Sequence, residues 1–386
     1  MAFRKYAGDK IFTGEQWYGS GHAVIADPSG KIEGIVPLAD AGPDVQFVEG
    51  IISPGFVNCH VHLELSHLRG KIDEGGGMAE FLMSVIRQRQ QDPVLIREAV
   101  NSALDEMFQN GIVGAGDICN TAESILPKQG SPILIHHFIE AIGSDPSLAK
   151  ERYTQSRRLL ESFQEVFPGR CSIVPHTLYT VSPALMQLIA STQGNSLLSA
   201  HSQESQAEEQ FLRSGSGPLR SLFGQLNIDA SEMENIDGSL PGYLLSYFSR
   251  QQTMILVHNV TTSASDILYL KAHQQVLPPF ILCLCPRANM FIGNGLPDIP
   301  LLERSGFPIV LGTDSLASNH SLSILEEMRV IHHHFPGIPL EKLFSWATFD
   351  GARALQMHDK LGSLAPGMRP GLICCTHDLT RVTRLL

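Results

Sequence analysis

Eight short apolar runs, separated by stretches with the periodicity of amphipathic helices, dominate the chain from residue 51 onward. The runs cover residues 51–60, 112–118, 133–139, 172–176, 197–201, 254–258, 280–285 and 308–314. Short apolar strands that alternate with helices are typical of a parallel sheet covered by helices. Eight such units favour a closed barrel over an open doubly wound sheet, which usually has fewer strands and a glycine-rich first turn. We therefore predict an α/β fold with a (β/α)8 TIM barrel.

The helices of this barrel are expected between and after the runs. They span residues 79–91, 94–109, 147–166, 183–192, 205–225, 239–249, 263–274, 298–305, 322–335 and 340–356. Glycine and proline at 215–218 predict a break within the helix at 205–225.

Both ends of the chain carry a different pattern, made of short β-like runs and turns. The first runs lie at residues 10–14, 23–32 and 45–50. Asp27-Pro28-Ser29-Gly30 predicts a tight turn between two strands. Residues 362–371 return to this turn-rich pattern near the other end. We expect a small β-sandwich domain built from residues 1–52 and 358–386, and a barrel domain at 53–357.

Polar residues close five of the eight apolar runs. These residues are His60, His176, His201, His258 and Asp314. Catalytic groups of (β/α)8 barrels lie at the carboxyl ends of the strands, so these five positions predict an active site. His62 follows His60 by two residues, and side chains at i and i+2 of a strand project to the same face. Part of the chain's surplus of 16 histidines thus maps to one barrel mouth.

Three imidazoles and one carboxylate from this set form a ligand group suited to Zn²⁺ or Fe²⁺. The predicted ligands are His60, His62, His201 and Asp314. We expect one divalent ion, Zn²⁺ with Fe²⁺ as the alternative, and a further position open to water. Glu204 follows His201 by three residues, which places a carboxyl group beside the metal, and we predict that Glu204 is the proton shuttle. Glu208 and Glu209 fit acids in the first turn of a helix better.

Two of these segments resemble signatures of the amidohydrolase superfamily. Residues 53–62 (SPGFVNCHVH) are similar to its first barrel strand, and residues 310–315 (VLGTDS) to its eighth. With Pro175-His176, the spacing from His201 to Glu204, His258 and residues 285–289 (CPRAN), the resemblance covers nearly the whole chain. It implies the mononuclear nucleoside and nucleobase deaminase branch, similar to S-adenosylhomocysteine deaminases and guanine deaminases. The fourth run lacks the lysine that bridges two metals in binuclear branches, which supports a single metal.

Residues 62–66 (HLELS) and 211–218 (FLRSGSGP) look most like the aminodeoxyfutalosine deaminases of menaquinone biosynthesis. The resemblance therefore implies deamination of an adenine-type base, with 6-amino-6-deoxyfutalosine expected first and ammonia as product. Asp314 would accept a proton from the attacking water, Glu204 would protonate the ring nitrogen, and His258 would stabilise the developing oxyanion. Contacts to substrate are expected from His176, Arg287, Asn289, Glu64 and Arg69. Arg287 and Asn289 are expected in a loop after the seventh strand, and Asp117 would support the site.

Other reactions at the same site stay open. They are the deamination of guanine, cytosine, adenosine or S-adenosylhomocysteine, and hydrolysis of a cyclic amide or a halogenated heteroaromatic ring. A barrel that serves only as a scaffold is a further alternative, disfavoured by the complete polar set. The cytidine-deaminase fold is excluded because its P-C-x-x-C motif is missing, since Cys283-Leu284-Cys285-Pro286 has another spacing and order.

Charge and composition constrain the partners. The chain has 28 Lys and Arg against 39 Asp and Glu, a net charge of −11, which disfavours nucleic-acid polymers and anionic membranes. We find no apolar run of the roughly 18 residues that a membrane helix needs, and no secretory signal at residues 1–9. Seven scattered cysteines indicate a reducing compartment. We expect a cytoplasmic enzyme for a small nucleoside or nucleobase, with a homodimer as an open alternative.

Overall fold

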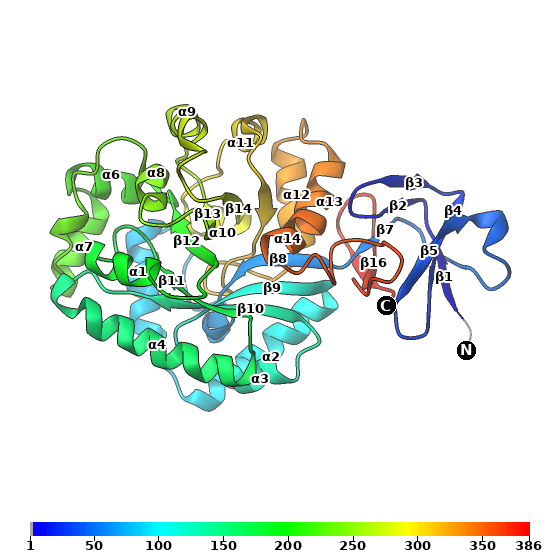
Figure 1. Ribbon diagram of the computed structural model, residues 1–386, viewed down its shortest axis with the longest axis horizontal. Coiled ribbons are helices and arrows are strands. Elements are labelled where there is room, and N and C mark those ends of the chain that lie inside the picture. Colours follow the sequence, from blue (N-terminus) through cyan, green and yellow to red (C-terminus); the bar gives the residue numbers. More distant parts are fainter. Residues whose placement is uncertain (1–2) are drawn as a thin grey trace.

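Eight parallel strands form a closed barrel in the computed structural model, which describes residues 3–386 (Figure 1). The barrel strands are β8 (Phe56–Val61), β9 (Ile112–Cys119), β10 (Leu134–Ala141), β11 (Cys171–Pro175), β12 (Leu197–Ser202), β13 (Thr253–His258), β14 (Phe280–Leu284) and β15 (Ile309–Leu311). Nearly every residue of these strands is buried, as expected for parallel strands covered on both faces. The α/β barrel prediction is confirmed.

The barrel has two halves, one formed by β8 to β11 and the other by β12 to β15. Two seams join these halves, one between β11 and β12 and the other between β15 and β8. At one seam the His201 N–H donates to the His176 carbonyl at 2.9 Å. At the other, the N–H groups of Thr313 and Asp314 donate to the His60 carbonyl at 3.0 and 3.1 Å. Closure of a parallel barrel brings all carboxyl ends to one mouth. The backbone groups that make both seams belong to residues at that mouth.

Helices cover the barrel and connect its strands. They are α1 (Gly77–Gln88), α2 (Pro93–Gln109), α3 (Ile125–Gln129), α4 (Ala149–Val166), α5 (Pro183–Ala190), α6 (Gln206–Ser214), α7 (Pro218–Leu226), α8 (Leu240–Leu245), α9 (Ala264–His273), α10 (Pro286–Ile292), α11 (Ile299–Ser305), α12 (Ile324–His334), α13 (Leu340–Ala347) and α14 (Phe349–Ala354). Short 3-10 helices span Leu38–Asp40, Leu63–Leu68 (η2), Pro146–Leu148 and Ser231–Met233. Between residues 3 and 386, none of the helices has the length and apolar character needed to cross a membrane.

Two helical predictions are wrong. Residues 285–289 were expected as a loop, but α10 begins there with Pro286 in its first turn, where the fixed φ of proline suits a helix. The helix expected at 340–356 is two helices, because Thr348 has φ −130° and ψ −85° and its hydroxyl donates to the Phe344 carbonyl at 2.6 Å. The break predicted at 215–218 is confirmed between α6 and α7.

Strands from both ends of the chain form two further sheets beside the barrel, the blue and red region of Figure 1. Their strands are β1 (Arg4–Ala7), β2 (Lys10–Phe12), β3 (Trp17–Gly19), β4 (His22–Ala26), β5 (Ile32–Pro37), β6 (Gln46–Phe47), β7 (Ile51–Pro54), β16 (Leu372–Cys375) and β17 (Val382–Arg384). One sheet has the order β5-β4-β1-β6, and the other β17-β16-β7-β2-β3. Buried side chains of both sheets, among them Val24, Ile52 and Leu372, form one apolar cluster.

The chain passes from these sheets to the barrel at Gly55. The run expected as one strand at 51–60 is two strands, since β7 pairs with β2 and β16 whereas β8 pairs with β9. A Cβ atom at Gly55 would overlap the Val113 side chain, so the close passage requires glycine. The domain boundaries at 52/53 and 357/358 stay predictions, and Met1 and Ala2 of the first range lie outside the described residues.

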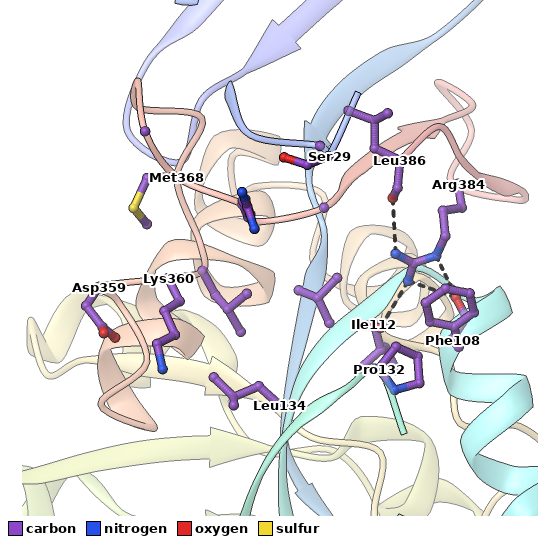
Figure 2. A pocket seen from close by; sticks show the side chains of 16 residues that line it. Ser29, Phe108, Ile112, Pro132, Leu134, Asp359, Lys360, Met368, Arg384 and Leu386 are labelled. Carbon is purple, nitrogen blue, oxygen red and sulfur yellow. Dashed lines mark hydrogen bonds between the residues drawn. The ribbon is translucent and has the colours of Figure 1, made fainter. Parts of the chain in front are cut away.

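Arg384 of β17 contacts Phe108 and Ile112 of the barrel domain (Figure 2). Its guanidinium donates to the Phe108 carbonyl at 2.9 and 3.1 Å, to the Ile112 carbonyl at 3.1 Å and to the Leu386 carbonyl at 3.3 Å. The same group lies 3.9 Å from the centre of the Phe108 ring. The planar fork of arginine thus satisfies a carbonyl in the last turn of α2 and the first carbonyl of β9.

We expect Arg384→Met to lower the free energy of unfolding by about 2 kcal/mol, because buried carbonyls lose their donors and the ring loses its cation. Denaturant unfolding of the full chain measures this change. Arg381→Met serves as the control, because Arg381 is exposed and directly precedes β17, and this variant should leave the free energy of unfolding unchanged. Equal stability of the two variants would contradict a linking role for Arg384.

Candidate metal centre and active site

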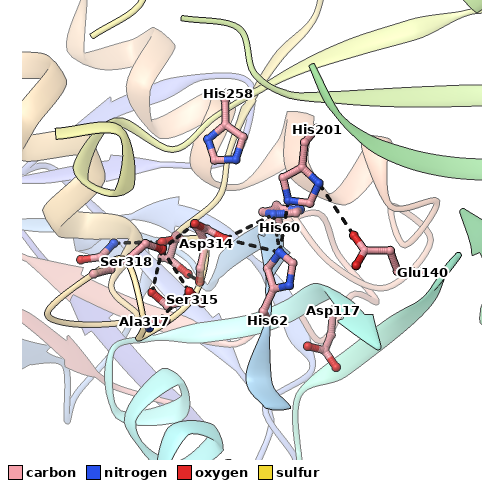
Figure 3. A network of polar contacts seen from close by, with 12 residues as sticks. His60, His62, Asp117, Glu140, His201, His258, Asp314, Ser315, Ala317 and Ser318 are labelled. Atoms are coloured by element: carbon pink, nitrogen blue, oxygen red, sulfur yellow. Dashed lines mark hydrogen bonds and ion pairs between the residues drawn. The ribbon is translucent and has the colours of Figure 1, made fainter. Parts of the chain in front are cut away.

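Four predicted ligands meet at the carboxyl ends of β8, β12 and β15 (Figure 3). The Nε2 atom of His62 lies 3.1 Å from Nε2 of His60 and 3.3 Å from Nε2 of His201. Oδ1 of Asp314 lies 3.6 Å from Nε2 of His60 and 3.4 Å from Nε2 of His62. Three imidazole nitrogens and one carboxylate oxygen therefore face a common point.

These separations fit a divalent ion. Ligands about 2.0–2.1 Å from a tetrahedral zinc ion lie ~3.4 Å from one another, close to the distances above. The Nδ1 atom of His201 lies 3.2 Å from the His176 carbonyl oxygen, a contact that places the ring proton on Nδ1 and leaves the Nε2 lone pair free for metal. The four residues suit a bound metal. The ligand atoms of His60, His201, Asp314 and also His258 all lie within 4.8 Å of one another, so His258 is a further residue within reach of the same ion.

The charge states of these groups suit coordination as well. Burial, with the neighbouring histidines, lowers the pKa of His62 to about 3 and that of His201 well below its ordinary value, so both rings are neutral. Burial alone would raise the pKa of Asp314, but its hydrogen bond with His60 and the nearby imidazoles hold that pKa well below the usual range. Neutral imidazoles and an ionised carboxylate are the metal-binding forms.

Asp314 adopts a backbone conformation that few aspartates have. Its φ is 57°, in the left-handed region, immediately beyond β15. The Ser318 hydroxyl donates to Oδ2 at 2.5 Å, so Oδ1 remains directed at the histidines. Such strained residues cluster at functional sites, where the surrounding structure over-determines them. Gly312, two residues earlier, is packed so closely that a Cβ would lie 2.8 Å from the Cβ of His60.

His258 and Glu204 lie beside the four-residue cluster. Nε2 of His258 is 3.5 Å from Oε1 of Glu204, and Nδ1 lies 2.8 Å from Oδ1 of Asn289. Nε2 is buried and has no hydrogen-bond partner among residues 3–386, although it faces the cluster. His258 also has a positive φ of 78°. Asn289 therefore orients a ring whose other nitrogen is free to meet a ligand.

The Glu204 carboxyl group is poised to carry a proton. Burial, followed by the charges of Asp314 and Glu208, raises its pKa well above the ordinary value. Its backbone N–H donates to Oε2 of Glu208 at 2.6 Å, and the Gln203 N–H donates to Oε1 of the same carboxylate at 3.1 Å. Glu208 and Glu209 lie in the first turn of α6, as predicted. Glu208 thus fixes the backbone that presents Glu204.

A cavity of about 210 Å³ opens onto the cluster. Its polar lining includes His62, His176, His201, Glu204 and Asp314. Its apolar lining includes side chains from α1 such as Phe81 and Val85 and from α7 such as Leu222 and Phe223. Nδ1 of His176 lies 2.7 Å from the Thr180 hydroxyl, which orients that ring at the cavity wall. The cavity therefore offers both polar groups and an apolar surface to a ligand.

Four of the five residues expected near the substrate do not line this cavity. Arg69 is exposed and pairs with Glu106 of α2. Arg287 donates to the Ser321 hydroxyl at 2.7 Å. The buried Glu64 carboxylate accepts the N–H groups of Asn120 and Thr121 at 3.0 and 3.1 Å. Each side chain is bound to a neighbouring protein segment instead. Asn289 contacts His258 rather than the cavity.

Two charged residues that line the cavity were not predicted, Glu140 and Arg89. Glu140 is the second-last residue of β10 and lies one residue beyond the run expected at 133–139. The rule that polar residues closing an apolar run mark the active site could therefore have identified it. Its Oε1 atom is 3.8 Å from Nδ1 of His201, and burial raises its pKa to about 7. Arg89 follows α1, and nothing in its sequence context distinguishes it from other surface arginines.

A (β/α)8 barrel with histidines and an aspartate at its carboxyl mouth defines a metal-dependent hydrolase. The model of the amidohydrolase family matches residues 51–384, and the chain belongs to that family. It is therefore an enzyme that hydrolyses carbon–nitrogen bonds with the help of a divalent metal.

Among its relatives, adenosine deaminase of Helicobacter pylori is 26% identical over 318 residues, which are 81% of this chain and 76% of that protein. Aminodeoxyfutalosine deaminase of Nitratiruptor sp. is 27% identical over 289 residues, 72% of this chain and 67% of the relative. The crystal structure of Helicobacter pylori aminofutalosine deaminase with methylthio-coformycin has a TM-score of 0.82 at 22% identity, covering 97% of this chain and 92% of that one. This structural likeness establishes the shared fold.

We expect His201→Ala to weaken zinc binding by more than about 100-fold, because losing a direct ligand should exceed the 10–100-fold typical of outer partners. Competition with a chromophoric chelator measures the affinity. His333→Ala, at an exposed position of α12, should bind zinc as the parent does. Unchanged zinc affinity in His201→Ala would show that the cluster does not hold the ion.

Proposed function

We propose that the chain is a hydrolytic deaminase for an adenine-type base, with 6-amino-6-deoxyfutalosine as substrate. The observation that carries this proposal is the buried Glu204 carboxyl beside the cluster of three histidines and Asp314. A protonated carboxyl at this place suits a heteroaromatic ring, whose nitrogen must be protonated before the neighbouring carbon accepts a nucleophile. Relatives named as deaminases of adenine nucleosides support the same reaction.

We assign the metal to His60, His62, His201 and Asp314, and Zn²⁺ is the ion that this set of three nitrogens and one oxygen suits best, with Fe²⁺ as the alternative. When bound, such an ion acidifies water and so supplies the hydrolytic nucleophile at neutral pH.

The chain's own residues carry the protons. Asp314 accepts the proton of the attacking water, and Glu204 donates to the ring nitrogen next to the attacked carbon. The Asn289 amide oxygen accepts the Nδ1–H of His258, so Nε2 faces the site as an acceptor for the attacking water, and it can donate to the oxygen that bears the developing charge once it has taken a proton from that water. With its own proton given to the ring, the Glu204 carboxylate then helps to pass a proton of the added water, first held by Asp314, to the departing amine, which leaves as ammonia. His176 contacts the base from the cavity wall.

The shape of the cavity supports a nucleoside with an apolar extension. The polar groups at the cluster accommodate the base, while Phe81, Val85, Leu222 and Phe223 of the same cavity offer an apolar surface to the rest of the substrate. α7 follows the segment 211–218, whose sequence is similar to aminodeoxyfutalosine deaminases. A free base would leave this apolar wall uncovered, so it disfavours guanine and cytosine.

Ammonia release from 6-amino-6-deoxyfutalosine, adenosine, S-adenosylhomocysteine, guanine and cytosine, together with chloride release from a chlorotriazine, tests the proposal. We expect kcat/KM for 6-amino-6-deoxyfutalosine to exceed that for adenosine by at least about tenfold, because buried apolar contacts stabilise the transition state. A higher kcat/KM for another nucleoside would refute the substrate assignment but keep the reaction. Hydrolysis of the chlorotriazine alone would refute both.

We expect Glu204→Gln to lower kcat by about 10²–10⁴-fold, because the amide cannot transfer a proton to the ring. Steady-state ammonia release and zinc content are measured together, so that loss of metal is not mistaken for loss of the acid. Glu209→Gln, five residues along at the surface of α6, should retain full activity. If the Glu204→Gln variant kept activity within a few-fold of the parent, another group would have to supply the proton.

A further inference from the structure

The strongest buried charge pair of the barrel lies outside the cavity, between Lys128 and Asp117. Both side chains are fully buried, and Nζ of Lys128 contacts Oδ2 of Asp117. The ammonium group also donates to the Ser124 hydroxyl at 2.7 Å and to the Cys119 sulfur at 3.3 Å. Burying two charges is costly, and well-packed apolar residues often stabilise a protein as much. A pair in this position therefore calls for a further explanation.

The second carboxylate oxygen of Asp117 indicates why a buried charge pair lies here. Oδ1 accepts the backbone N–H of Leu63 at 2.9 Å, and Leu63 directly follows the metal-facing His62. Figure 3 shows Asp117 below the His62 side chain. Strand β8 ends at Val61, so the position of the His62 ring depends on how the chain is held just beyond the strand. Lys128 engages Oδ2 and thereby leaves Oδ1 directed at Leu63.

A reciprocal contact ties the same two segments. The carboxylate of Glu64 accepts the backbone N–H groups of Asn120 and Thr121, which follow β9. The side chain of Asn120 in turn donates to Oε2 of Glu140 at 3.0 Å, and the other oxygen of Glu140 is 3.8 Å from Nδ1 of His201. The segment after β9 therefore contacts Glu64, two residues beyond His62, and Glu140, whose other oxygen faces His201.

We propose that Asp117 is a positioning residue of the metal centre, which holds the backbone at Leu63 and so directs the His62 ring toward the ion, while Lys128 compensates the buried charge of that carboxylate. This inference rests on the proposed metal ligands but not on the identity of the substrate. Lys128 does not bridge metals, since its ammonium is enclosed by Asp117, Ser124 and Cys119 behind the cluster.

Two double variants separate positioning from mere packing. Asp117→Asn with Lys128→Met removes both charges but keeps an oxygen that can accept the Leu63 N–H. Asp117→Leu with Lys128→Met also removes both charges but has no acceptor. Metal-free proteins are prepared with a chelator, and the dissociation constant for Zn²⁺ is measured by competition. Thermal unfolding of the same metal-free samples reports the structural contribution.

We expect zinc affinity within about threefold of the parent for the Asn-containing variant, and a loss of about 10–100-fold for the Leu-containing variant. Equal zinc affinities of the two variants, whether both retained or both reduced, would overturn the inference. Failure of the parent protein to bind zinc would instead refute the proposed metal centre.

A second pair of variants tests the inference if the Leu-containing double variant does not fold. Leu63→Pro removes the donor and leaves Asp117 and Lys128 intact, and proline is tolerated at the first residue of a helical turn such as η2. Leu63→Ala controls for the lost side chain and keeps the N–H group. We expect Leu63→Pro to bind zinc at least about tenfold more weakly than Leu63→Ala. Equal affinity of these two variants would also overturn the inference.

Discussion

The convergence of three imidazole nitrogens and one carboxylate oxygen at a buried point organises the structure around it. Polar atoms at this depth normally need hydrogen-bond partners, and lone pairs that face one another do not provide them. A divalent cation resolves the conflict, so ion binding and stability of the barrel mouth are coupled. The coupling reaches the backbone, because His60 and His201 take part in the seams that close the barrel and also direct their rings to the cluster.

Groups around the cluster divide into those that orient a ligand and those that handle protons. Ser318 engages one oxygen of Asp314, and Asn289 engages one nitrogen of His258, so that in each case the other atom faces the site. Glu208 holds the backbone that carries Glu204. The apolar side chains that line the cavity from α1 and α7 contribute no proton chemistry, and we propose that they select substrates by what these carry beyond the base.

Much of the fold could be predicted because strands and helices leave different periods in the sequence, and the site because parallel strands all end at one mouth. The same reasoning failed where it assumed that residues next to a metal ligand in the sequence also direct their side chains into the active site. After Val61 the chain turns into η2, which carries Glu64 toward the segment after β9 and Arg69 to the surface. The Lys128–Asp117 pair was out of reach as well, since nothing local shows that a lysine in a loop helix turns inward to an aspartate eleven residues before it.

The central claim is that the barrel mouth binds one metal through His60, His62, His201 and Asp314. X-ray absorption at the zinc edge on the reconstituted protein tests it most directly. Zinc held by these four residues should show only nitrogen and oxygen neighbours at about 2.0–2.1 Å, together with the outer-ring scattering of three imidazoles. Sulfur neighbours near ~2.3 Å, or scattering from fewer than two imidazoles, would contradict it.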